Sequence, residues 1–125
     1  LWIHQEKANE EVMQPMFHML SCFNLKLGED MDAFRSAYVD FVDYMKSIDL
    51  VEDSGAIGRR QPDTPMDTDN ERQHEYFVIM SFRNQTQVDA AYAYIKKHVE
   101  PGESSHNDVY KKVQDPIFIC WQDLL

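Results

Sequence analysis

The sequence lacks the long apolar run that a membrane-spanning helix requires, because nowhere in its 125 residues do 18 apolar residues follow one another. The N-terminal stretch LWIHQEKANEEV has neither the basic flank nor the apolar core of a signal peptide. Basic residues are scarce, with 12 Lys and Arg against 22 Asp and Glu and a formal net charge of -10. Such a field opposes binding to phosphate backbones. We therefore expect a soluble, cytoplasmic protein that engages neither nucleic acid nor membrane.

Cysteine, glycine and proline are also few, at 2, 4 and 5 residues. Cys22 and Cys120 stand almost a chain length apart, so they form no disulfide framework and are expected to be reduced, buried thiols. Low glycine and proline with 12% aromatic residues argue against disorder over most of the length. The chain is long enough for one domain whose core needs neither disulfides nor metal.

Several catalytic and metal-binding patterns are missing. The five histidines show no HxH or HExxH spacing, and there is no thiolate pair at zinc spacing, so we expect no structural metal and no cofactor. GxSxG motifs are absent as well, which leaves a nucleophilic hydrolase without sequence support.

Hydrophobic periodicity predicts two long helices and four strands. The strands are expected at residues 16–27, 54–61, 74–83 and 116–124, the second only weakly signalled. The first helix begins after Asp30 as N-cap, and the second after Asn84, with Gln87 completing a variant of the capping box. Pro101 and Gly102 end the second helix, and Ser105 caps a short third helix.

Two segments lack such periodicity. Residues 62–73 carry two prolines and four acids, which is typical of an exposed loop. Residues 1–15 are mainly polar with one apolar pair, Trp2 and Ile3, and we interpret them as an N-terminal arm that docks on a partner subunit. The alternative is an accident of the gene start, because Met13 and Met16 could each begin a natural chain.

The order of these elements favours one α+β domain over residues 16–125, of the ferredoxin-like type. Four antiparallel strands are expected in spatial order 4-1-3-2 with the helices on one face. We place Phe17, Met19, Phe23 and Leu25 of the first strand, and Ile117, Ile119 and Trp121 of the last, against the helices. The opposite face would carry His18, Leu20, Cys22, Asn24, Phe118, Cys120 and Gln122.

That second face is too apolar to remain in water. The simplest cover is a second copy of the same sheet, so we expect a homodimer in which two sheets close into an α+β barrel. The enclosed space mixes apolar walls with a few polar groups, as small-molecule pockets do. The seven side chains of this face are therefore the predicted ligand-binding residues.

Three stretches carry a family resemblance: MFHMLSCFNLKLGED at residues 16–30, HEYFVIMSFRNQTQVDAAYAYIKKHVEP at 74–101 and PIFICWQDL at 116–124. They resemble the dimeric α+β barrel superfamily, particularly the Dabb type and its antibiotic-biosynthesis monooxygenase relatives, over residues 16–125. The resemblance implies a homodimer with a pocket inside the barrel or between sheet and helices. It also implies cofactor-free oxygenase or isomerase chemistry among the activities to consider, although superfamily members include haem-degrading enzymes and proteins without an assigned activity. Residue by residue, His18 matches the Dabb pattern and His98 loosely matches a histidine of the second helix.

Each candidate residue has a structural alternative. His18 suits an acid, a base or a ligand near neutral pH, or is a strand histidine bonded to a neighbour. Asn24 either orients a polar ligand atom or meets solvent. Cys22 and Cys120 either approach as a redox pair or pack as small apolar groups. The GAIGRR stretch has the outline of an RNA-clamping loop without its flanking helices, so Arg59 and Arg60 either pair with a carboxylate of a ligand or partner, or lie on a solvated turn.

Two functions remain open from the sequence. The first is a homodimer that binds a small, largely apolar molecule, with His18 or His98 moving a proton if the protein is an enzyme. The second is a non-catalytic association module whose barrel is packed solid with side chains. A volume of the barrel lumen below that of a small ligand, roughly 300 Å³, would favour the module.

Overall fold

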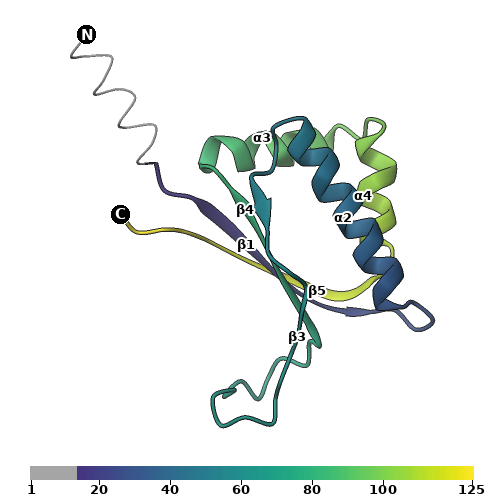
Figure 1. Cartoon of the computed structure of the whole chain (residues 1–125), viewed down its shortest axis with the longest axis vertical. Coiled ribbons are helices and arrows are strands. Elements are labelled where there is room, and N and C mark those ends of the chain that lie inside the picture. Colours follow the sequence, from purple (N-terminus) through teal and green to yellow (C-terminus); the bar gives the residue numbers. More distant parts are fainter. Residues whose placement is uncertain (1–13) are drawn as a thin grey trace.

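The structure, a computed structural model, describes residues 14–125. The predicted arm lies almost wholly outside the described residues, and it stays a prediction together with the domain boundary at residue 16. The elements follow in the order β1 (Phe17–Leu25), α2 (Met31–Ser47), β2 (Asp53–Ser54), β3 (Gly58–Arg59), β4 (Tyr76–Phe82), α3 (Gln85–Lys96), α4 (Gly102–Tyr110) and β5 (Val113–Gln122) (Figure 1).

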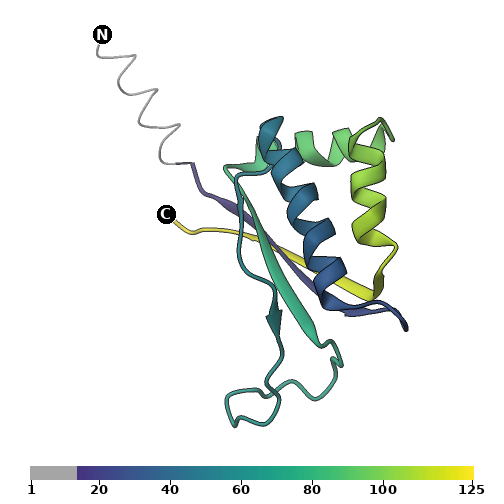
Figure 2. The ribbon, with the colours of Figure 1, turned by 45° about the vertical axis from the view of Figure 1, so that its right-hand side comes forward.

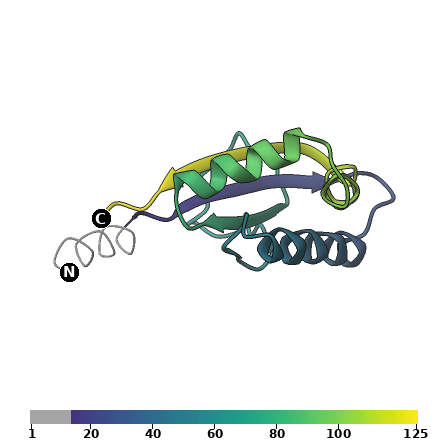
Figure 3. The ribbon, with the colours of Figure 1, turned by 90° about the horizontal axis from the view of Figure 1, so that it is seen from above.

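The sheet has the order β2-β4-β1-β5, with β3 also paired to β4. β1 is antiparallel to both neighbours, β4 and β5, and runs side by side with β5 in the view from above (Figure 3). The helices all lie on one side of this sheet (Figures 1 and 2). The ferredoxin-like α+β fold and the predicted strand order are therefore confirmed. The predicted strand over 54–61 is instead split into β2 and β3, with Gly55–Ile57 between them.

The core fills the space between the sheet and α2. Phe23 of β1 and Phe34 of α2 are both 2% exposed, and their ring centroids lie 4.8 Å apart. β4 contributes every second side chain, as the alternation of a half-buried strand predicts. The remaining buried members of this core are Tyr38, Phe41, Val42, Met45, Val51, Tyr76, Val78, Met80, Phe82 and Ala91, with Phe17, Met19 and Leu25 packed against it. The predicted orientation of β1 is confirmed.

The caps of both long helices are as predicted. The Asp30 carboxylate accepts a hydrogen bond from the backbone N–H of Ala33 at 2.8 Å. The Asn84 side chain accepts one from the N–H of Gln87 at 2.9 Å. Gln87 returns a contact, accepting from the N–H of Arg83 at 2.7 Å. These bonds satisfy N–H groups that a helix start leaves unpaired.

The third helix differs from the prediction. It begins at Gly102 rather than after Ser105, and α3 ends at Lys96, so Pro101 and Gly102 open α4 instead of closing α3. Proline suits a helix start because its missing N–H would have no helical partner there. Gly102 is buried against α3, where an added Cβ would collide with the ring of Tyr94.

One extra residue in β5 reverses the predicted faces of that strand. Leu25 pairs with Val113 and Ser21 with Phe118, so four steps along β1 are matched by five along β5. Such a bulge turns every later side chain to the other face. It lies at Asp115, whose φ is 55°.

The face assignment of β5 was therefore wrong. Phe118, Cys120 and Gln122 stand opposite Ser21, Met19 and Phe17, on the helix side of the sheet. Ile117, Ile119 and Trp121 stand opposite Cys22, Leu20 and His18, on the side without helices. Alternation could not decide this, because β5 is apolar on both faces.

The loop between β3 and β4 is organised by charge. The Arg60 guanidinium donates to both carboxylate oxygens of Asp67 at 2.8 Å and to the backbone carbonyls of Asp69 and Arg72. Arg72 in turn donates to the Asp69 carboxylate at 2.6 Å. The predicted loop is confirmed, and two of its four acids, Asp67 and Asp69, are partners of two arginines.

Acid should release this loop. The hydrogen bond from Arg72 lowers the pKa of Asp69 from 3.8 to about 2, and that from Arg60 lowers the pKa of Asp67. A carboxyl whose pKa is depressed on folding contributes stability above its unfolded pKa and loses it as pH falls through the folded pKa. We expect the Arg60 and Arg72 side-chain N–H resonances to shift between roughly pH 4 and pH 2 in an NMR titration. Arg72→Gln should move the Asp69 titration up toward 3.8, whereas Arg35→Gln on α2 should leave it unchanged. An Asp69 midpoint that ignores Arg72→Gln would contradict the assignment.

Candidate functional site

An apolar cavity of about 100 Å³ lies between the sheet and the helices, and we call it the helix-side cavity. Most of its walls belong to the core described above. Its lining is Met19, Ser21, Phe23, Phe34, Tyr38, Phe41, Val78, Met80, His106, Val109, Tyr110, Val113, Pro116 and Phe118. The apolar lining favours an apolar occupant, and the volume limits its size.

His106 of α4 is the one ionisable side chain of this lining other than the tyrosines. Its ring lies between two aromatic rings, with centroids 5.5 Å from Phe41 and 5.8 Å from Tyr110. Burial lowers the pKa of His106 below its ordinary value, although the nearby Glu103 carboxylate opposes this shift. His106 is consequently a neutral imidazole at pH 7, able to accept a proton.

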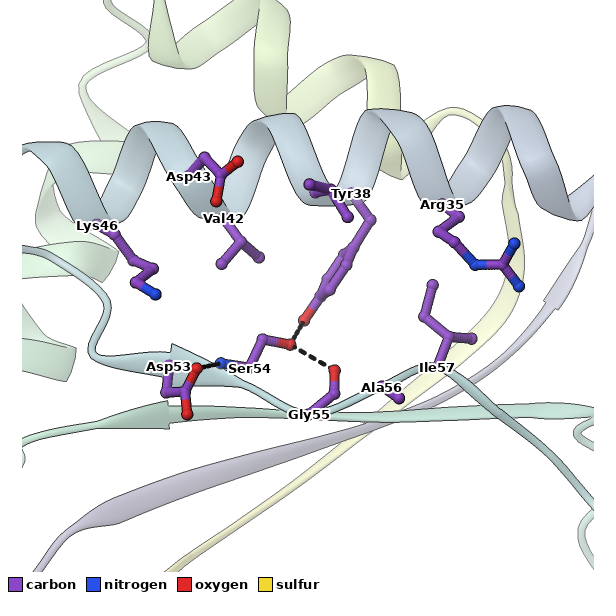
Figure 4. Close-up of a pocket in the computed structure, with 11 residues that line it drawn as sticks. Arg35, Tyr38, Val42, Asp43, Lys46, Asp53, Ser54, Gly55, Ala56 and Ile57 are labelled. Carbon is purple, nitrogen blue, oxygen red and sulfur yellow. Dashed lines mark hydrogen bonds between the residues drawn. The ribbon is translucent and has the colours of Figure 1, made fainter.

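Tyr38 contributes its ring to the cavity and its hydroxyl to a neighbouring groove. This groove, of about 390 Å³, lies between α2 and residues 53–57 (Figure 4). There the Tyr38 hydroxyl and the Ser54 hydroxyl are 2.7 Å apart, and the Ser54 N–H donates to the Asp53 carboxylate. Burial raises the pKa of Tyr38, the Ser54 bond notwithstanding. These three groups bond to one another, and the charged side chains of Arg35, Asp43 and Lys46 also line the groove.

Within residues 14–125 no helix covers the opposite side of the sheet, and we call that side the uncovered sheet face. It consists of His18, Leu20, Cys22 and Asn24 of β1, Phe77, Ile79 and Ser81 of β4, and Ile117, Ile119 and Trp121 of β5. Ile79, Ile117, Ile119 and Trp121 are 38%, 40%, 42% and 40% exposed. A continuous apolar area of this kind is unusual on a monomer.

His18 is held at one end of this face by two polar partners. Its Nδ1 lies 2.7 Å from the Ser81 hydroxyl oxygen, and its Nε2 lies 2.8 Å from a carboxylate oxygen of Asp123. The Trp121 ring packs against the imidazole with centroids 5.4 Å apart. The side chain of His18 is only 17% exposed.

The bulge divides the predicted ligand-binding residues between the two faces of the sheet. His18, Leu20, Cys22 and Asn24 share the uncovered sheet face as expected. Phe118 lines the helix-side cavity instead, and Cys120 lies on that same side of β5. Cys22 and Cys120 therefore point away from each other, and the redox pair is excluded. Cys22 is buried as predicted, but Cys120 is exposed, so the prediction of two buried thiols was wrong for Cys120. Desolvation raises the pKa of both thiols, so neither is an activated nucleophile.

Asn24 and His98 have local partners. The Asn24 side-chain oxygen accepts a hydrogen bond from the N–H of Glu75 at 2.8 Å and so ties β1 to the start of β4. His98 follows α3 rather than lying within it, with a φ of 53° and a side chain 72% exposed. Its Nδ1 meets the Glu103 carboxylate at 2.9 Å. The structure therefore does not bring His98 to His18.

Arg59 and Arg60 pair within the chain. Arg60 holds the loop, and Arg59 lies over the Tyr76 ring and 3.4 Å from Glu75. They line a hollow of about 310 Å³ with His74. No helix flanks GAIGRR, since β2 and β4 are its neighbours, so the RNA-clamping interpretation fails.

Residues 14–125 hold neither a metal-ligand cluster nor a membrane-spanning helix. No three His, Cys, Asp or Glu side chains in that range are grouped closely enough to hold a metal ion. In the same range, no helix combines the length and the apolar character needed to cross a membrane.

Comparison with known proteins supports the fold. No protein-family model and no curated protein sequence matches the chain. Solved structures do match. A variant of SnoaB from Streptomyces nogalater, a cofactor-independent oxygenase, has a TM-score of 0.58 and 9% identity, over 85% of this chain and 90% of that one.

Two further structures are similar. A dimeric ferredoxin-like protein of unknown function from Thermobifida fusca has a TM-score of 0.56 and 8% identity, over 88% and 92% of the two chains. A Dabb family protein with a ferredoxin-like fold from Mesorhizobium loti has a TM-score of 0.54 and 17% identity, over 89% of this chain and 99% of that one. These matches confirm the ferredoxin-like fold that the resemblance implied.

Three residues of these sites were missed by sequence reasoning. His106 falls three residues before Val109 and four before Tyr110, a helical spacing that marks one face of a helix. Ser81 and Asp123 carry no such signal. Their role depends on strand pairing, which brings together residues 63 and 105 positions from His18.

The environment of His106 can be tested by its titration. We expect the midpoint in an NMR titration to lie below 6.5, because partial burial disfavours the imidazolium. Tyr110 is half exposed and stacks on His106, so Tyr110→Ala should admit water and raise the midpoint. Tyr92→Ala, at an exposed tyrosine of α3, is the matched control. A midpoint at or above 6.5 in the unaltered protein would contradict the burial argument.

Proposed function

We propose that the chain is one protomer of a homodimeric α+β barrel and that it binds a small, largely apolar molecule in the helix-side cavity. The observation that carries the dimer is the uncovered sheet face. Each square ångström of apolar surface removed from water contributes about 25 cal/mol, and a two-fold partner covers this face with an identical one. The dimeric description of the Thermobifida fusca protein supports the same arrangement.

The chemistry that fits the cavity is proton transfer without a cofactor. His106 is a neutral base in an apolar environment, where it can take a proton from a carbon or hydroxyl acid bound beside it. It replaces His18 and His98 in this role, because neither of those lines the cavity. SnoaB, a cofactor-independent oxygenase of the same fold, supports oxidation or isomerisation as the reaction class. His18, Leu20, Cys22 and Asn24 are proposed to lie inside the barrel rather than around the ligand.

A second candidate is an association module without ligand. The cavity volume favours it, since about 100 Å³ is well below the roughly 300 Å³ at which ligand pockets begin. The two candidates share the dimer and differ in what enters the cavity.

The dimer is tested by light scattering after size-exclusion chromatography at micromolar concentration. We expect twice the mass of the chain for the unaltered protein. Ile119→Lys places a charge at the middle of the uncovered sheet face and should give a monomer, because burying an unpaired ammonium is costly. Tyr92→Lys, at a residue of α3 that is 66% exposed, should remain a dimer. If the unaltered protein is a monomer at these concentrations, the proposed dimer is overturned.

Ligand binding is tested with benzene and indole as probes of the cavity. A probe at 100 times its Kd should stabilise the protein by about 2.7 kcal/mol in thermal unfolding. Ser21→Leu adds bulk to the cavity wall and should remove this stabilisation while the dimer persists. Ser104→Leu, at an exposed position of α4, should keep it. A dimer that neither probe stabilises, and that releases no small molecule on denaturation, would favour the association module.

A further inference from the structure

We propose that Ser81, His18 and Asp123 form a second site, a nucleophilic centre that accepts acyl groups from activated esters. The three side chains make one hydrogen-bonded chain across the sheet, with Ser81 to Nδ1 of His18 at 2.7 Å and Asp123 to Nε2 at 2.8 Å. They come from three different elements, β4, β1 and the residue after β5. The site is separate from the helix-side cavity, because these residues belong to the other side of the sheet.

The roles of the three residues follow from donors and acceptors. The Asp123 carboxylate can only accept, so Nε2 of His18 carries the proton and Nδ1 presents a lone pair. That lone pair faces the Ser81 hydroxyl, which donates to it. A serine bonded to a base that is itself oriented by a third group is the arrangement of an activated nucleophile. Trp121 packs against the imidazole and fixes its plane further.

The transfer balances without any oxidant or reductant. The Ser81 oxygen forms a bond to the acyl carbon while its proton moves to Nδ1 of His18. The bond from the acyl carbon to the ester oxygen then breaks, and the departing oxygen receives that proton. Water attacks the acyl-serine in the same way, giving a carboxylic acid and the original serine.

The surroundings limit the class of ester. Ser81 is paired through its backbone on both sides, to His18 and to Asp53, so the adjoining N–H groups are not free to stabilise an oxyanion. Esters with good leaving groups need that stabilisation least. Leu20 is two residues beyond His18 in β1, and Ile79 is two residues before Ser81 in β4. These two side chains lie opposite each other and offer an apolar surface for an acyl chain. With a chain charge of -10, neutral aryl esters of short aliphatic acids are the fitting substrates.

An ester can reach Ser81 in the proposed dimer as well as in a monomer. Only this argument about access rests on the proposed dimer. His18 is the second residue of β1, Ser81 the second-last of β4, and Asp123 follows the last residue of β5. The site therefore lies at one end of the uncovered sheet face, where a barrel of two sheets is open. The Asp123 side chain is 44% exposed.

Covalent labelling of the full chain tests the nucleophile without any substitution. A fluorophosphonate probe followed by peptide mass spectrometry should modify Ser81. Ser104 is the internal control, an exposed serine 2.9 Å from the Glu100 carboxylate and without a histidine partner, and it should stay unmodified. Absence of modification at Ser81, or equal modification at Ser104, would overturn the proposal. Ile119→Lys should still be labelled at Ser81, so a failed dimer and a failed nucleophile are distinguishable.

Turnover of p-nitrophenyl butyrate tests the other two residues. The unaltered protein should release a burst of p-nitrophenolate equal to the protein concentration, and Ser81→Ala should abolish it. His18→Ala should slow acylation about 100-fold, because the general base is lost. Asp123→Asn should lower kcat about tenfold with KM unchanged, as expected of a positioning residue. Ser104→Ala should match the unaltered protein. An Asp123→Asn variant with full kcat, or a Ser81→Ala variant that keeps the burst, refutes the assignment.

Discussion

The pairing of β1 with a strand on each side is the constraint on which the rest of the structure depends. β1 is the one strand bonded along its length to both β4 and β5, so its side chains define the two faces of the sheet. Phe23 and its neighbours on one face carry the core, and His18 and its neighbours on the other meet Ser81 and Trp121. Both sites described above are therefore built on alternate residues of a single strand.

The bulge at Asp115 decides which alternate side chains of β5 face the helices and which face the other side of the sheet. Its single extra residue moves Phe118 into the helix-side cavity and Trp121 onto His18. His74 holds this irregularity, since its Nε2 donates to the Asp115 carbonyl at 2.8 Å while its side chain is almost fully buried. The Nδ1 of the same ring is buried and has no hydrogen-bond partner among residues 14–125, which is consistent with the Nε2–H tautomer that the carbonyl requires.

Much of the fold was predictable because it rests on local signals. Asp30 and Asn84 are capping residues by their chemistry, and the alternation in HEYFVIMSFR gave β4 directly. The faces of β1 followed from its contrast between large apolar and polar residues. β5 has no such contrast, so its faces depend on register with β1, which is a tertiary property. The same holds for Ser81 and Asp123, whose meeting with His18 no local pattern encodes.

The bulge has a further consequence for the outer edge of the sheet. In the described part of the chain β5 has a neighbour on one side only, and it is ten residues long with apolar side chains on both faces. An open edge of that length is a template for strand addition and aggregation. Pro116 has no N–H to donate to a neighbouring strand, and the positive φ of Asp115 breaks the straight course of β5. The kink that sorts side chains between the two faces thus also protects the protein from pairing indiscriminately with strands of other molecules.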